Sequence, residues 1–409
     1  SIALGASGTV PAVQWQSVVV SDGSTVTTMV AGRGYFVNNT SAAGLVKLPA
    51  SAATGDLVSI KDYAGNFGTN KLTIQRNSHN IQGVAANSEI TTDRASVSLV
   101  YIDATKGWLF TNESNVADLR EPLFTEATGG TVTTSGNFKI HTFTGSGNFV
   151  VSQIGNSPIP GAGPSNVDYV VVAGGAGSGN SSPVGRGGGG GGAGGFRTTF
   201  PSPGCNAGAF PVTAQTYPIT VGGGGAGAAN PNSYANSAGS NSVFSTITSA
   251  GGGAGSGYGS SASAGGSGGG GSGGGPAQSG AAGNTPPVSP PQGLGGGEGA
   301  PSNNRGGGGG GGASSVGSDT TNLGANGGGG TSTAITGSAV TRAGGGGGGS
   351  DSTGGTGGSG GGGTGGTATS APSVTGGTAN TGGGGGGGGN GVNGKAGGSG
   401  VVILRYKYQ

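Results

Sequence analysis

The sequence predicts an all-β protein: an N-terminal β-sandwich or barrel, then a strand-anchored glycine-rich domain of packed, extended polyglycine-II-like helices. Three observations lead to this class. No window places apolar residues at the 3.6-residue spacing of an amphipathic α-helix. Short runs of β-branched and aromatic residues follow one another, separated by turn residues. Of 107 glycines, 88 lie after residue 165, between two short apolar segments.

Charge and cysteine usage exclude several classes of protein. The 409 residues carry a formal charge of +2, which gives no electrostatic basis for binding nucleic acid or an anionic membrane. The longest apolar runs fall short of the ~20 residues that cross a bilayer, so we expect no membrane insertion. Cys205 is the one cysteine, which excludes a disulfide framework within the chain. The first residues lack a secretory signal pattern, which predicts synthesis in the cytoplasm.

Residues 1–15 are a mixed N-terminal segment, and a small all-β domain of ordinary composition is predicted over residues 16–112. Local turns such as Ser21-Asp22-Gly23 and Lys106-Gly107 separate its strands. The predicted strands are Ser17–Val20, Val26–Val30, Tyr35–Val37, Leu45–Leu48, Leu57–Lys61, Lys71–Arg76, Ser96–Asp103 and Trp108–Thr111. The aromatic residues on these strands predict a core that contains Tyr35, Tyr101, Trp108 and Phe110.

Residues 113–165 are predicted to be a connector that carries one β-hairpin. The segments 138–144 and 148–151 are rich in Phe, Val and Ile, and Gly145-Ser146-Gly147 lies between them. A linker rich in proline and glycine follows at 158–164 and leads into the glycine-rich domain.

The glycine-rich domain is predicted over residues 166–409, bracketed by two apolar strands. The opening strand covers residues 167–173 and the closing strand covers residues 401–406, and both are rich in valine. We expect the closing strand to return and pair beside the opening strand, so that the glycine runs between them become long loops anchored by a small sheet.

Two alternatives for the glycine runs are collagen and disorder. Collagen requires glycine at every third position, whereas this chain has uninterrupted blocks. Disordered chains usually carry more charge than the four acidic and seven basic residues found after residue 165. Strand-like segments also punctuate the runs in a repeated pattern, which favours order. Because ordering costs about 1–2 kcal/mol per residue and a hydrogen bond returns about 0.5–1.5, the anchoring sheet is needed.

Two parts of the chain resemble known families. Residues 34–38, 48–50, 55–62, 80–83 and 106–108 are similar to a small β-domain of structural proteins from marine tailed bacteriophages. A second set resembles the glycine-rich domain of phage tail fibres and related virion proteins. It comprises His141–Thr144, Tyr169–Gly175, Gly194–Arg197 and Gly398–Tyr406.

The resemblance implies a fibre or other appendage of a virion, made in the host cytoplasm. It implies a homotrimer, attached to other virion proteins through its N-terminal region and touching a host surface glycan or outer-membrane protein. A purely structural appendage without receptor binding is the alternative: a capsid or neck fibre, or an extracellular matrix filament. Which part of the particle would carry the chain stays open.

No motif in the sequence indicates an enzyme or a cofactor. Matches to G-x-G-x-x-G are expected by chance among so many glycines, and no G-x-x-x-x-G-K-[ST] occurs. His79 and His141 are far apart and lack cysteine neighbours, which makes a metal site improbable. Asp56, Asp62, Asp93 and Asp103 fall near turns of the β-domain, where turn chemistry explains them as well as glycan cleavage does. We therefore expect a non-enzymatic protein without cofactor or metal.

The interruptions of the glycine runs are the candidates for recognition. Rigid glycine helices carry no side chains, so specificity must come from the loops between them, and the alternative is that these loops are passive caps. Tyrosine, arginine and asparagine suit adaptable contacts to sugars and protein surfaces. The residues predicted to lie near the distal surface and touch the receptor are Phe196, Arg197, Asn232, Tyr234, Asn236, Tyr258, Pro286 and Pro287.

Overall fold

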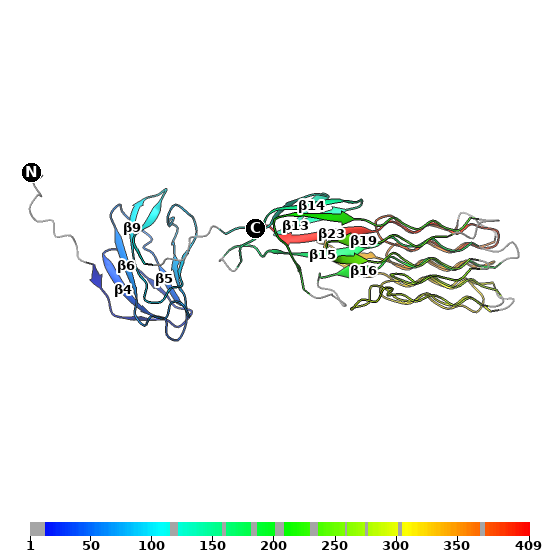
Figure 1. Cartoon of the computed structure of the whole chain (residues 1–409), viewed down its shortest axis with the longest axis horizontal. Coiled ribbons are helices and arrows are strands. Elements are labelled where there is room, and N and C mark those ends of the chain that lie inside the picture. Colours follow the sequence, from blue (N-terminus) through cyan, green and yellow to red (C-terminus); the bar gives the residue numbers. More distant parts are fainter. Residues whose placement is uncertain are drawn as a thin grey trace, which may run out of the picture. The chain divides into compact units, whose positions relative to one another are not determined.

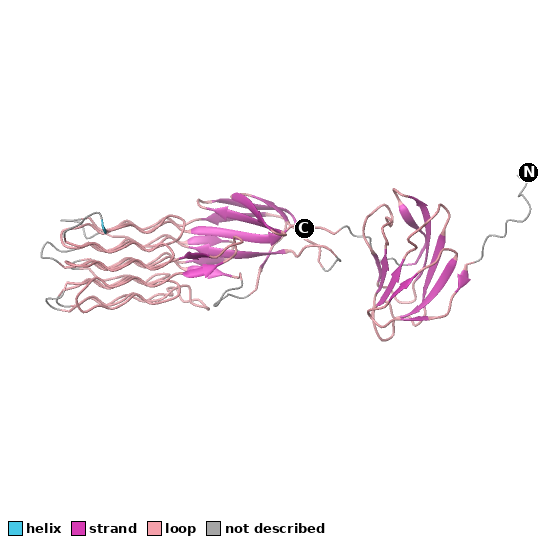
Figure 2. Ribbon diagram, turned by 180° about the vertical axis from the view of Figure 1, so that it is seen from behind, coloured by secondary structure: helices cyan, strands magenta, loops and turns pink. Residues whose placement is uncertain are grey.

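The computed structural model shows an all-β chain, which confirms the predicted class (Figure 2). It describes residues 13–114, 122–157, 161–180, 186–200, 208–229, 236–257, 260–274, 277–301, 305–368 and 373–409. These residues fall into two compact units. The first is drawn from Ser1–Leu123 and Asn156–Ala162, and the second from Phe124–Gly155 and Gly163–Gln409. None of the described helical turns is long and apolar enough to cross a membrane.

The first unit contains two open sheets. One has the order β1-β4-β6-β9-β10, with β2 also paired to β4, and the other has the order β3-β5-β7-β8. The strands are β1 (Gln14–Trp15), β2 (Val19–Val20), β3 (Val26–Thr28), β4 (Arg33–Asn38), β5 (Gly44–Lys47), β6 (Leu57–Asp62), β7 (Leu72–Gln75), β8 (Ser88–Ile90), β9 (Ser96–Asp103) and β10 (Gly107–Ser114).

Strands that follow one another from β2 to β7 alternate between these two sheets. Their neighbours within a sheet are therefore parallel, as in the pairs β4–β6 and β5–β7. The short turns of the sequence thus carry the chain from one sheet to the other. One apolar cluster draws on both sheets and includes Tyr35, Tyr101 and Trp108, with Phe110 packed against it, which confirms the predicted core.

The second unit contains a five-stranded sheet, a six-stranded sheet and one hairpin. The sheet orders are β11-β14-β18-β19-β20 and β12-β13-β23-β15-β16, with β17 also paired to β15, while β21 and β22 form the hairpin. The strands are β11 (Glu126–Thr128), β12 (Thr131–Ser135), β13 (Phe138–Phe143), β14 (Gly147–Gln153), β15 (Asn166–Val172), β16 (Phe196–Thr198), β17 (Phe210–Pro211), β18 (Thr216–Thr220), β19 (Ser242–Phe244), β20 (Ile247–Ser249), β21 (Thr331–Thr333), β22 (Val340–Arg342) and β23 (Val401–Lys407).

The closing strand β23 lies between β13 and β15, in the middle of its sheet. Val401 is opposite Val172 and Val402 is opposite Val171 in an antiparallel register. The expectation that the two apolar strands pair side by side is therefore confirmed. Alternating residues of β15 and β23 feed two apolar clusters, one on each face of this sheet, because successive side chains of a strand point to opposite faces.

The predicted hairpin of the connector does not form. β13 pairs with β12 and β23, whereas β14 pairs with β11 and β18 in the other sheet. Both edges of each strand are taken by these partners, so the two strands have no edge left for each other. The prediction failed because strands 401–407 and 216–220, far away in the sequence, compete for the same edges.

The glycine runs extend from one end of these sheets as segments that lie side by side, here called the glycine bundle (Figure 1). Along residues 188–193 the main-chain N–H groups bond to three different segments in rotation, at 2.8–3.0 Å. Gly188 and Gly191 donate to Gly388 and Gly385, Gly189 and Gly192 donate to Ser256 and Gly253, and Gly190 and Ala193 donate to Gly308 and Gly311.

The carbonyl groups of the same stretch face three further segments. Gly188 and Gly191 accept from Gly349 and Gly346, Gly189 and Gly192 accept from Gly179 and Ala176, and Gly190 and Ala193 accept from Gly270 and Ser267. One central segment therefore bonds to six surrounding segments, and its buried N–H and C=O groups are satisfied, as a folded interior requires. Main-chain hydrogen bonds thus hold together a bundle whose central segment is nearly all glycine.

Close approach of the backbones explains why these positions are glycine. A Cβ atom added to Gly190 would lie 2.1 Å from the carbonyl oxygen of Gly346, which is far inside van der Waals contact. The requirement here is steric, because the backbone of Gly190 stays outside the left-handed region.

Candidate functional site

The glycine bundle has two ends with different surroundings. At the sheet end, its segments join the strands or reverse in turns such as 284–292. At the far end, they reverse in turns such as 320–323, across which the N–H of Ser318 donates to the carbonyl of Asn326 at 3.0 Å. Whether a loop between two glycine runs lies at the sheet end or at the far end depends on how many times the chain has reversed direction before it.

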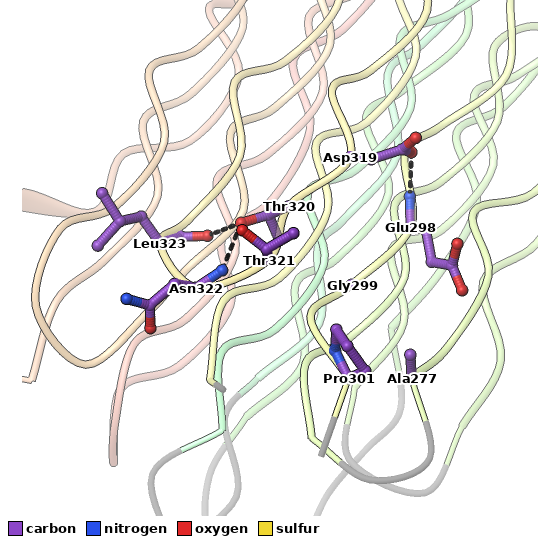
Figure 3. Close-up of a pocket in the computed structure, with 9 residues that line it drawn as sticks. All are labelled: Ala277, Glu298, Gly299, Pro301, Asp319, Thr320, Thr321, Asn322 and Leu323. Carbon is purple, nitrogen blue, oxygen red and sulfur yellow. Dashed lines mark hydrogen bonds between the residues drawn. The ribbon is translucent and has the colours of Figure 1, made fainter. Parts of the chain in front are cut away.

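A hollow of about 650 Å³ lies at the far end (Figure 3). Three neighbouring stretches of the bundle line it. The first contributes Ala277, the second contributes residues from within 298–301 at the end of a segment, and the third contributes Asp319 and the 320–323 turn. The lining residues are Ala277, Glu298, Gly299, Pro301, Asp319, Thr320, Thr321, Asn322 and Leu323. We call this the far-end hollow. Its volume lies within the ~300–1,000 Å³ range of small-ligand sites.

Hydrogen bonds hold the wall of the far-end hollow in place. Oδ1 of Asp319 accepts from the N–H of Glu298 at 2.7 Å, as the dashed line in Figure 3 shows. The hydroxyl of Thr320 donates to the carbonyl of Leu323 and accepts from the N–H of Asn322 at 3.2 Å. The turn is thereby pinned by its own side chains, which pre-organises what it displays.

The side-chain groups of the far-end hollow that these hydrogen bonds do not use are the ones that a ligand would contact. The side chains of Glu298, Thr321 and Asn322 are exposed, and no hydrogen bond to them is found among the described residues. Leu323 is 45 % exposed and adds an apolar surface. Carboxylate, hydroxyl and amide groups beside an apolar patch provide for reversible recognition. No group of three or more acidic, histidine or cysteine side chains placed for a metal occurs in the described part of the chain.

Phe196 and Arg197 do not lie at the far end. Both belong to β16 at the sheet end, opposite Val172 and Val171 of β15. Phe196 is 7 % exposed and packs in the cluster of Ile140 and Val170, so the expectation that it is a surface residue is wrong. The sequence shows an aromatic residue after a glycine run but not that a strand begins there.

Pro286 and Pro287 are exposed, but they also lie at the sheet end. The N–H of Asn284 donates to Gly266, and the Gln292 side-chain carbonyl accepts from Ala250, which directly follows β20. The predicted distal position of this proline loop is therefore wrong. The chain has reversed at both ends of the bundle before reaching it, and the sequence does not mark each reversal.

Asn236 lies near the far end, where its side-chain amide donates to the carbonyl of Gly255. It is partly buried and holds two segments together. Asn232, Tyr234 and Tyr258 lie outside the described residues. The predicted set therefore does not converge on one surface in the part of the chain that is described.

Sequence reasoning missed the far-end hollow. Its signal was present: residues 319–323 read Asp-Thr-Thr-Asn-Leu, a polar break with one apolar residue between two glycine runs. Asn322 is of a residue type favoured for recognition, but the stretch lacks the aromatic residue, arginine or proline that marked the predicted loops.

The titratable groups with shifted pKa lie mainly in the sheets. Burial lowers the pKa of His141 and raises the pKa of Tyr406 to about 12. Burial also raises the pKa of Asp168, while Arg405 opposite it acts in the other direction. These groups lie in the sheets that anchor the bundle and not at its far end.

Comparison with known proteins gives one match. Residues 151–407 match the model of a family described as a glycine-rich domain. No curated protein matches the chain.

Proposed function

The chain belongs to the glycine-rich domain family, and from the resemblance of its sequence to phage tail-fibre proteins we propose that it is a non-enzymatic fibre protein of a virion that adheres to a host cell. The far end of the glycine bundle makes the contact. The single observation that carries this proposal is the far-end hollow, a polar and partly apolar recess held by hydrogen bonds on a glycine-rich scaffold.

The scaffold supports the proposal because it is stiff. We infer that the bundle segments are polyglycine-II helices, since the bonding partners of residues 188–193 repeat every three residues. A left-handed extended helix of this type has three residues per turn. We also infer that the two sheets of each unit pack as a sandwich, because one apolar cluster draws on both.

Because the glycine runs of a stiff bundle offer few side chains to a partner, the residues that recognise the partner are expected in the turns. Loops on a rigid scaffold are where binding residues concentrate, because the scaffold fixes their geometry without competing contacts. The partner we propose is a host surface glycan or an outer-membrane protein. Assembly into a homotrimer multiplies weak single contacts by avidity, and the N-terminal region attaches the fibre to other virion proteins.

The test is binding of purified protein to host cells. Replacing Thr321, Asn322 and Leu323 by Gly, Ser and Gly removes the displayed groups, and cell binding is expected to fall about tenfold or more. The matched control replaces Pro286 and Pro287 by Gly and Ser at the sheet end and is expected to bind as wild type.

Both variants must give the wild-type unfolding temperature for the comparison to count. Equal binding by all three folded proteins would overturn adhesion through the far-end hollow. It would favour the alternative of a purely structural appendage, and light scattering would then distinguish a particle of fixed size from an indefinitely growing filament.

A further inference from the structure

A second, smaller hollow lies at the sheet end of the glycine bundle, which is the end opposite the far-end hollow. It has a volume of about 220 Å³ and is lined by residues from β15, β16, β17, β20 and the proline loop. Tyr169, Phe210 and Ile247 form apolar walls, Ser289 adds a hydroxyl, and Arg197 adds the one positive charge of the lining.

Arg197 reaches this hollow because of its place on the strand. It lies opposite Val171, on the face of the sheet that carries the cluster of Tyr169 and Val171, whereas Phe196 points to the other face. A guanidinium is thus placed at the border of the apolar layer between two sheets.

The guanidinium of Arg197 has few partners among the described residues. There its Nη1 makes one long hydrogen bond, 3.4 Å, to the carbonyl of Thr248, and its enclosed Nε finds no partner. No carboxylate lines the hollow among the described residues, and the nearby acid Asp168 lies opposite Arg405 instead. Arginine so placed normally forms bidentate bonds to a carboxylate or phosphate.

We propose that this hollow binds a carboxylate attached to a small ring. The carboxylate bonds to the outer edge of the Arg197 guanidinium, formed by Nη1 and Nη2, because Nε is enclosed. The ring packs against Phe210 and Ile247, and the hydroxyl of Ser289 is available to the ring substituents. The volume lies below the ~300–1,000 Å³ of drug-sized ligand sites, so a single ring fits and an extended chain does not.

Two sources share this chemistry: an acidic sugar and an aromatic or alicyclic acid. A phosphate group alone would leave the apolar walls uncovered, and a cation would face the charge of Arg197. The site is independent of adhesion through the far-end hollow, because the two are lined by different residues at opposite ends of the bundle.

The experiment is an NMR titration of the full chain that follows the ¹⁵N–Hε signal of Arg197. Probes are glucuronate and benzoate, with glucose and benzamide as their neutral counterparts and inorganic phosphate as the simple anion. We expect glucuronate or benzoate to shift the signal saturably, with an affinity at least about tenfold above that of its neutral counterpart. Whichever acid binds more tightly identifies the source.

Variants then assign the site, with the affinity read from the backbone ¹⁵N–H signals of Ala209 and Ile247, because the Nε signal is lost when Arg197 is replaced. Arg197→Gln is expected to lower the affinity for the acid about tenfold, and Arg197→Lys by less, because lysine keeps the charge but not the planar fork. The control Arg33→Gln, whose guanidinium bonds to Gln16 in the other unit, is expected to leave binding unchanged.

Three results would overturn the proposal. They are equal binding of acid and neutral probes, unchanged affinity in Arg197→Gln, or phosphate binding as tightly as both carboxylates. Where Arg197→Gln proves unstable, Ser289→Ala and Phe210→Leu test the walls of the same hollow. If neither variant lowers the affinity for the acid, the proposal is also overturned.

Discussion

The hydroxyl of Tyr406 lies 3.2 Å from Nε2 of His141, and the two rings stack at a centroid distance of 5.5 Å. His141 donates from Nδ1 to the carbonyl of Gly129 at 2.7 Å, and in the neutral imidazole Nε2 accepts from the hydroxyl of Tyr406. The same hydroxyl accepts from the N–H of Ala127 at 3.1 Å. Burial lowers the pKa of His141 and so favours the neutral ring, and the chain of bonds joins β13 and β23 to the start of the other sheet.

Acid should therefore weaken the second unit. Burial lowers the pKa of His141 from its ordinary 6.5, and Lys139 acts in the same direction, although the bond to Gly129 opposes it. Below pH 6.5 His141 is protonated in the unfolded chain but stays largely neutral in the folded one. The free energy of unfolding therefore falls as the pH falls. The loss is at most about 1.4 kcal/mol per pH unit.

Urea unfolding at pH 7.5, 6.5 and 5.5 measures this loss. Replacing His141 by Gln is expected to lower stability at pH 7.5 but to flatten the dependence below 6.5. Lys139 and Glu126, the charged groups that act on His141 and Tyr406, remain in both proteins. Parallel loss of stability in wild type and variant would show that His141 is not the responsible group.

Replacing glycine by alanine should destabilise the protein inside the glycine bundle and should be tolerated where the glycine is exposed. In Gly190→Ala the new methyl group would lie 2.1 Å from the carbonyl oxygen of Gly346, and about 1–3 kcal/mol or more of stability is expected to be lost. A Cβ added to Gly223 would meet no atom within 4 Å, so Gly223→Ala should be neutral or stabilising by about 0.4–1 kcal/mol. Thermal unfolding of the pair checks this, and equal effects would contradict the close packing of the bundle.

Two arginines should differ in what their removal does. Arg342 is 8 % exposed, its Nη1 has no hydrogen-bond partner in the described part of the chain, and burial lowers its pKa. Replacing it by Met is expected to leave stability unchanged or raise it by about 1 kcal/mol, since a buried unpaired charge is removed.

Arg405→Met is the contrasting change. Arg405 faces Asp168 across the strands and lies 3.8 Å from the ring centre of Phe138. Its loss leaves a half-buried carboxyl without its counter-charge and should cost about 1–3 kcal/mol. Chemical denaturation of both variants is the measurement, and a larger loss for Arg342→Met would refute this assignment.

Removing the closing strand should unfold the second unit. Without residues 401–409, β13 and β15 lose the strand between them, and the segments of the glycine bundle lose their anchor. We expect limited proteolysis to digest residues beyond 124 while the first unit stays protected. Deletion of Gln409 alone is the control, and a protease-resistant bundle in the longer deletion would show that it stands without its sheet.

The sequence by itself determined the all-β class, the core around Trp108 and the pairing of the two apolar strands. Each follows from local residue chemistry. Val171 and Val402 are β-branched residues in short apolar runs, and such runs must pair and be buried wherever they lie in the chain. The near absence of charge after residue 165 similarly favoured an ordered glycine region over a disordered one.

Only the tertiary structure decided which interruption lies at which end of the glycine bundle. Arg197 and Pro286 follow glycine runs much as Thr321 does, yet the first two lie at the sheet end and the third at the far end. Glycine has no side chain to mark where a segment reverses, so the reversals cannot be counted from the sequence. The partners of β13 and β14 were likewise set by strands far along the chain, because strand edges are filled by long-range competition.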